Sequence, residues 1–216
     1  MANHIPKKVR KPGVARDMRL KKQAKQARSI ATVSAIVEAA TYILLRDGPG
    51  GYTANRVAER AGVNIASFYQ YFPNKEALLF HIIQRNWEEQ LARLTPILGQ
   101  PGRTHALRLR DFIREFFLIE AAEAGLRGAL RLASVDIRDS EEFRALMAKG
   151  YGLTRTFIAE AVKDGSSEDL EFIVNFVVLV ITSFGERTTD AKPSSAELIR
   201  QADLLSEMLT TQFGIA

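Results

Sequence analysis

Short polar and aromatic side chains recur between Thr53 and Phe72 at a spacing that suits contact with DNA. The segment reads TANRVAERAGVNIASFYQYF, which predicts a short helix, a tight turn at Gly62 and a second short helix. These are the dimensions of a helix-turn-helix, whose second helix enters the major groove. Small and apolar residues suited to packing the two helices together occupy the internal positions: Val57, Ala58, Ala61, Gly62, Val63 and Phe68. The polar side chains lie on the outward face, which is therefore a candidate for contact with DNA bases.

Further helices are needed to position this motif. Apolar residues at helical spacing predict a first helix from about residue 30 to the glycine and proline cluster at 48–51. Thr53 is a candidate N-cap of the second helix, which extends through Ala61, and the third helix covers about 64–71. Asn74 is a candidate N-cap of a fourth helix that ends near Leu94, before Pro96. These helices would form the first compact unit.

The remaining pattern is also helical. After the break at Pro96–Gly102, helices are predicted over about 104–123, 126–134, 140–163, 168–187 and 195–212. No hairpin signal and no internal repeat interrupts them, so the predicted fold class is all-α. The helix at 168–187 is apolar nearly all round, and the last helix carries a stripe that includes Leu205. Together they have more apolar surface than one helical layer can bury, and this favours a homodimer.

The composition narrows the class of protein. The chain has 216 residues, of which 46% are hydrophobic and 25% charged, as in a globular protein. Its longest apolar run, at 172–184, is too short to span a bilayer, and no apolar stretch follows the basic N-terminus. Without cysteine, disulfides, thiolate metal sites and cysteine nucleophiles are excluded. We therefore expect a cytoplasmic protein that does not bind a membrane.

The charge is concentrated at one end of the chain. Residues 1–28 hold ten basic side chains and one acidic side chain, whereas the rest of the chain is net acidic although the total is +5. This asymmetry predicts a basic flexible arm over residues 1–27 that contacts a polyanion. A solubilising tail is the alternative.

The residues around the motif resemble the DNA-binding signature of the TetR family of transcriptional regulators. The resemblance covers about residues 30–80, and the continuation YQYFPNKEALL makes it specific. Residues 53, 57–58, 61–63, 68–69, 71–72 and 75–78 carry it, whereas the C-terminal part is similar only in length and helicity. It implies a three-helix helix-turn-helix DNA-binding domain (28–75) and a helical ligand-binding and dimerisation domain (76–216), which follow the basic arm (1–27).

The resemblance also implies residues that contact double-stranded DNA. The Thr53 hydroxyl would bind a phosphate beside the positive end of its helix, and Lys75 would bind another. Residues 64–67 would face the groove, and Tyr69 and Tyr71 would contact the backbone or a base. A solvated helix face is the alternative for each polar residue. The full predicted set is Arg28, Thr53, Asn64, Ile65, Ala66, Ser67, Tyr69, Tyr71 and Lys75.

The segment from about residue 80 to 187 is the candidate sensor for a small-molecule effector of apolar or amphipathic character. Aromatic residues and one arginine form the predicted ligand site: Trp87, Phe112, Phe116, Phe117, Arg131 and Tyr151. Glu120, Asp136 and Arg138 could order a polar ligand beside Arg131. Packed core is the alternative for the aromatic residues and solvation for the charged ones.

The expected function is that of a dimeric, ligand-responsive repressor of a palindromic operator, since repression is the usual mode in the family. The family joins two chains through a four-helix bundle of the last two helices. One alternative is a similar DNA-binding protein that acts through a protein partner. A helical enzyme is a second alternative, but His4, His81 and His105 have no partner at a telling spacing. We therefore expect no catalytic residue, metal site or cofactor.

Overall fold

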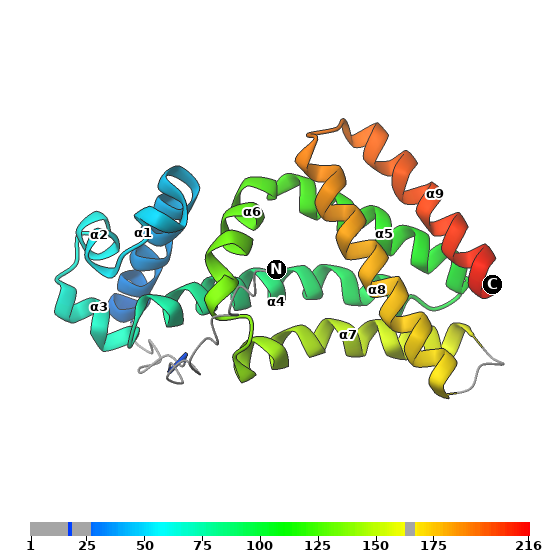
Figure 1. The fold of residues 1–216 in the computed structure, drawn as a ribbon, viewed down its shortest axis with the longest axis horizontal. Coiled ribbons are helices and arrows are strands. Elements are labelled where there is room, and N and C mark those ends of the chain that lie inside the picture. Colours follow the sequence, from blue (N-terminus) through cyan, green and yellow to red (C-terminus); the bar gives the residue numbers. More distant parts are fainter. Residues whose placement is uncertain (1–16, 19–26, 163–166) are drawn as a thin grey trace, which may run out of the picture.

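The computed structural model describes residues 17–18, 27–162 and 167–216, and the described chain is helical without a strand (Figure 1). This confirms the predicted all-α fold. The elements are α1 (Ala27–Gly51), α2 (Ala54–Arg60), α3 (Ile65–Tyr71), α4 (Lys75–Leu98), α5 (His105–Ala122), α6 (Ala124–Ala133), the 3₁₀ turn η1 (Ser134–Asp136), α7 (Glu141–Ala161), α8 (Ser167–Asp190) and α9 (Ser195–Phe213).

Side-chain caps determine where the helices begin. Asn74 Oδ1 accepts a hydrogen bond from the Ala77 N–H at 2.7 Å, and Thr53 Oγ1 accepts one from the Arg56 N–H at 3.3 Å. Such caps satisfy amide groups that have no partner within the helix. The sequence-based N-caps at Thr53 and Asn74 are therefore confirmed.

Gly48 ends the regular part of α1, whereas Pro96 does not end α4. The φ of Gly48, 65°, is left-handed, and a short turn follows. By contrast, α4 continues past Pro96 to Leu98, so the predicted end near Leu94 is wrong by four residues. Proline removes a single N–H donor at this position, and two more residues complete the last turn before Gly99.

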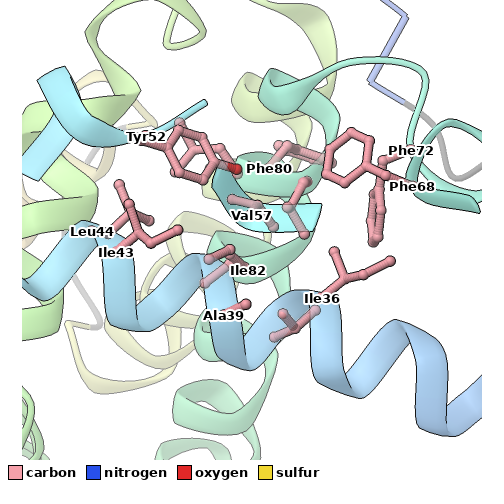
Figure 2. Packing of buried hydrophobic residues seen from close by; sticks show 14 of the residues in the cluster. Ile36, Ala39, Ile43, Leu44, Tyr52, Val57, Phe68, Phe72, Phe80 and Ile82 are labelled. Carbon is pink, nitrogen blue, oxygen red and sulfur yellow. The ribbon is translucent and has the colours of Figure 1, made fainter. Parts of the chain in front are cut away.

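The first hydrophobic core lies inside the helix-turn-helix unit, where α1, α2, α3 and the start of α4 meet (Figure 2). Ile36 and Leu44 of α1 pack with Val57 and Phe68. By length and composition α1 would also suit a membrane span. Six apolar residues of α1, however, are buried in this core, which accounts for their composition without a bilayer: Ile36, Val37, Ala39, Ala40, Ile43 and Leu44.

This core continues into the C-terminal half. Leu130 of α6 and Leu146 of α7 belong to it, and α6 packs directly against α1. A second core joins the end of α4 to α5, α7, α8 and α9, with Phe117, Ile158 and Val174 among its most buried members. In Figure 1, α4 runs from one unit to the other. The boundary expected near residue 75 therefore coincides with the start of a helix shared by both cores.

Residues 17 and 18 contact the helix-turn-helix unit. Met18 is only 3% exposed and belongs to the first core, and Asn74 Nδ2 donates to the Asp17 carbonyl at 3.0 Å. The other residues of the arm predicted over 1–27, apart from Ala27 at the start of α1, lie outside the described residues. The arm thus has an anchor beside the N-terminus of α4.

Candidate nucleic-acid interface and effector cavity

The turn between α2 and α3 fixes the orientation of the two helices. Gly62 has a φ of +66°, a conformation that residues with a Cβ rarely adopt, and the Val63 N–H donates to the Ala58 carbonyl at 3.0 Å. The side chains of Val57 and Phe68 are fully buried beside the turn. The chain therefore holds α3 rigidly against α2, as the predicted helix-turn-helix requires.

One face of α3 is open to solvent. Asn64, Ala66, Tyr69 and Gln70 are exposed, whereas Ile65 and Ser67 are half-buried. The Tyr69 ring is 44% exposed and meets Phe68 edge to face at 5.3 Å. Sequence reasoning omitted Gln70, although its place directly after Tyr69 on the same helix was a usable signal.

Tyr71 requires a correction. It was expected to contact DNA, but it is 6% exposed and belongs to the first core. The reason is helical periodicity: residues three and four apart share a face, so Phe68, Tyr71 and Phe72 all point inward. Tyr71 supports the orientation of α3 instead of extending the exposed face.

Asn64 has a structural role in addition to its predicted one. Its Oδ1 accepts from the Ala66 N–H at 2.8 Å and caps α3. This use of the oxygen leaves the side-chain N–H₂ group as the part that can donate to a base edge or a phosphate. Asn64 is therefore exposed, as predicted. Because its oxygen is bound in the helix cap, it can contact DNA only as a hydrogen-bond donor.

Tyr52 brings the two predicted phosphate contacts, Thr53 and Lys75, together. Its hydroxyl donates to the Lys75 carbonyl at 2.8 Å, and Lys75 Nζ donates to the Tyr52 carbonyl at 3.4 Å. Burial raises the pKa of the Tyr52 phenol well above its ordinary value, because the charged form would be desolvated, and nearby Glu76 adds to the effect. A neutral buried phenol thus joins the starts of α2 and α4.

Charged residues join the end of α1 to α2. The Asp47 carboxylate pairs with Arg56 and with Arg46, and Arg56 also donates to the Gly51 carbonyl at 2.9 Å. The hydrogen bond from Arg46 is the main reason that the pKa of Asp47 falls to about 2. Arg56 is therefore engaged within the protein, while Arg28, in the first turn of α1, is exposed.

A cavity of about 510 Å³ lies among α4, α5, α7 and α8. Four of the six predicted ligand residues line it: Trp87, Phe112, Phe116 and Tyr151. The cavity has a volume typical of sites for small molecules. Phe117 requires a correction, because it is fully buried and stacks on Phe184 at 5.8 Å instead of lining the cavity.

A smaller cavity of about 190 Å³ adjoins α6 and is lined by part of an ionic cluster, whose central pair, Arg127 and Glu120, is buried. The Arg127 guanidinium lies 2.8 Å from Glu120 and 3.0 Å from Glu123, and Arg131 lies 3.0 Å from Glu186. Burial raises the pKa of Glu120 despite the opposing attraction of Arg127. The structure thus places predicted Arg131 beside Glu120, whereas Asp136 and Arg138 are exposed.

Arg127 is a residue that the sequence analysis missed. It is the central cation of the ionic cluster and is almost fully buried. The usable signal was its spacing of four residues from Arg131, which places both side chains on one face of the predicted helix.

An all-helical chain with a rigid helix-turn-helix at one end and cavities in a second helical unit has the architecture of a DNA-binding regulator. Residues 32–82 match the family described as bacterial regulatory proteins, tetR family. The part of the chain that holds the helix-turn-helix therefore has the sequence pattern of this family of regulatory proteins. No curated protein matches the sequence.

Solved structures share the fold across most of the chain. The transcriptional regulator FadR from Bacillus subtilis, in complex with stearoyl-CoA, is 17% identical with a TM-score of 0.67, and the match covers 82% of this chain and 96% of FadR. FadR from Bacillus halodurans is 17% identical with a TM-score of 0.65, covering 81% and 94%. A putative tetR-family regulator from Mesorhizobium loti is 20% identical with a TM-score of 0.65, covering 86% and 98%. At these identities the similarity shows the fold.

The cap at Asn64 yields a test that separates folding from DNA contact. Asn64→Asp keeps a capping oxygen, so stability should stay unchanged, but the added negative charge should weaken DNA binding at least about tenfold. Asn64→Ala should lower the free energy of unfolding by about 1 kcal/mol. Thermal denaturation and DNA titration measure the two effects.

Ser194→Asp is the matched control for Asn64→Asp, because Ser194 caps α9, outside the helix-turn-helix unit. It should preserve both stability and DNA affinity. If Asn64→Asp binds DNA like the unmodified protein, Asn64 does not face the DNA.

Proposed function

We propose that the protein is a homodimeric transcriptional repressor that binds a palindromic operator and releases it when an amphipathic effector fills the cavity. The observation that carries this proposal is the exposed face of α3, with Asn64, Tyr69 and Gln70, on a helix whose opposite face is locked in a core. Rigid presentation of polar groups from a short helix suits insertion into the major groove.

The predicted contact residues divide into two groups in this proposal. Asn64, Ala66, Ser67 and the added Gln70 lie toward base edges, where they carry sequence preference. Thr53, Tyr69, Lys75 and Arg28 contact the sugar-phosphate backbone and set the register, and Ile65 supplies partly buried apolar contact. A protein that binds such a DNA target acts in the cytoplasm of a bacterial cell. This function requires no catalytic residue.

A second copy of the chain is the proposed occupant of an apolar surface on α8 and α9, the α8/α9 surface. Phe172, Leu179, Leu204 and Met208 are each about 60% exposed. A groove of about 680 Å³ runs between these helices. Leu205 has the opposite role from Leu204, because it is buried in the second core. Two recognition helices held by such a dimer would read half-sites about one DNA turn, ~34 Å, apart.

The effector acts by linkage in this proposal. The small cavity is lined by Arg127 and Leu130 of α6, and Leu130 also belongs to the first core, which holds the helix-turn-helix. A ligand that prefers one position of α6 must therefore change operator affinity by the same factor that DNA changes ligand affinity. The stearoyl-CoA bound by Bacillus subtilis FadR supports an amphipathic effector. Regulation through a protein partner is the second candidate.

Selection of bound duplexes from random sequence tests the proposed function. We expect a palindromic consensus that binds with an affinity of ~10⁻⁸ M or better at physiological salt. Lys75→Ala should weaken all duplexes alike, whereas Ser67→Ala should change the bases tolerated, each by about 1–3 kcal/mol. Equal affinity for every duplex would reject the proposal.

The dimer is tested by charge on the α8/α9 surface. Leu204→Glu should give a folded monomer, because the dimer would bury an unpaired charge at a cost of several kcal/mol. Light scattering at micromolar concentration measures the mass, and circular dichroism checks the fold. Leu132→Glu is the matched control, since Leu132 is an exposed leucine on α6, and it should remain dimeric. A dimeric Leu204→Glu variant would contradict the assignment.

The basic arm is tested by truncation before its anchor. Deletion of residues 1–16 leaves Met18 in the core and removes five basic side chains per protomer. The slope of log affinity against log salt should become shallower by about 0.9 for each phosphate that the truncated protein no longer neutralises. Replacement of the same five residues by glutamine controls for length and should give the same slope. An unaltered slope would identify the arm as a solubilising tail.

A further inference from the structure

The two cavities are adjacent and have unlike linings. Trp87, Phe116, Met147 and Thr182 line both of them. The larger cavity is lined mainly by apolar side chains such as Leu94. The smaller cavity is the polar end and reaches the ionic cluster on α5 and α6. A ligand that fills both cavities therefore needs an apolar body and a polar group near the shared residues, a place that we call the junction.

Both arginines at the polar end are already paired with carboxylates. Arg127 lies between Glu120 and Glu123, and Arg131 pairs with Glu186. An anionic ligand would have to enter beside carboxylates that already neutralise both arginines. Desolvating such an anion at this end, where both arginines are already paired, is costly.

The lining nevertheless has unused hydrogen-bond donors. Trp87 Nε1 and Arg127 Nε are buried without an acceptor. The acceptors nearby are used, since Gln90 donates to Glu120 at 3.3 Å and accepts from Arg127 at 3.2 Å. Among the described residues, no side-chain acceptor of this lining is buried without a partner. A buried donor without an acceptor costs about 1–3 kcal/mol, which a ligand can recover.

From these observations we infer that the effector has a long apolar chain and an uncharged acceptor head, such as an ester or thioester carbonyl, and is not a free carboxylate. The carbonyl accepts from Trp87 Nε1 at the junction, with Arg127 Nε as a second donor, and the chain fills the larger cavity. This inference rests on the proposed role of the cavity as the effector site.

Trp87 is the single tryptophan of the chain, so its fluorescence reports directly from this junction. The full-length protein is titrated with methyl laurate and with laurate below their aggregation concentrations. The two probes share one alkyl chain and differ in the charge of the head. We expect methyl laurate to bind at least about tenfold more tightly. Equal or tighter binding of laurate, or binding of neither probe, would overturn the inference.

Calorimetry on Trp87→Phe tests the donor, because phenylalanine keeps an aromatic ring without the N–H. Affinity for methyl laurate should fall by about three- to tenfold, as for one neutral hydrogen bond. Affinity for laurate should fall less, because the desolvation cost keeps its charged head away from the buried donor. Phe112→Leu is the matched control and should weaken both probes equally, since Phe112 lines only the apolar cavity. Equal losses for both probes in Trp87→Phe would assign Trp87 to packing and overturn its role as donor.

Operator binding by the unliganded protein separates this inference from the proposed function. A protein that selects an operator but prefers laurate refutes the head-group inference alone. A protein that binds methyl laurate preferentially but selects no operator refutes the repressor and leaves the ligand chemistry in place. If Trp87→Phe fails to fold, the comparison of the two probes on the unmodified protein still decides the result.

Discussion

Burial of the two ends of α4 in different cores is the constraint on which the rest of the structure depends. Leu78 and Leu79 are buried in the first core, whereas Leu94 and Leu98 are buried in the second. Each buried leucine contributes about 1.5–3 kcal/mol, so neither end can detach without a large loss. Because one helix connects them, α3 and the cavity of about 510 Å³ keep a defined position relative to each other. The contact of α6 with α1 is a second connection between the helix-turn-helix unit and the C-terminal helical unit.

This double connection explains why polar chemistry gathers where it does. The starts of α2 and α4 are joined through buried Tyr52, which keeps the candidate phosphate contacts on one rigid surface. At the other connection, the ionic cluster around Arg127 joins α6 to α5 and lines the smaller cavity. Removing one partner of a buried ion pair leaves an uncompensated charge, so the pairing resists small displacements and favours discrete arrangements of α6. The proposed linkage of effector to operator depends on that property.

Two opposite sides of α8 contribute to two different features, the α8/α9 surface and the cavity. On one side α8 supplies Val178 and Ile181 to the cavity, and on the other it exposes Phe172 and Leu179. A helix that is apolar nearly all round is usually buried on every side, and the proposed second chain would cover the exposed side. The proposed effector cavity and the proposed dimer surface thus share α8, so a ligand in the cavity would lie close to the contact that sets the spacing of the two recognition helices.

The sequence by itself determined the helices, the turn at Gly62 and the helix-turn-helix, because caps, glycine conformation and apolar periodicity are local properties. It also determined the charge asymmetry of the chain and most of the aromatic cavity lining. Only the tertiary structure decided that Tyr71 and Phe117 are core, that Leu204 and not Leu205 is exposed, and that Arg127 is buried beside Glu120. Periodicity shows that a helix has an apolar face, but the partner of that face depends on segments distant in the chain. Burial and ion pairing follow from that packing.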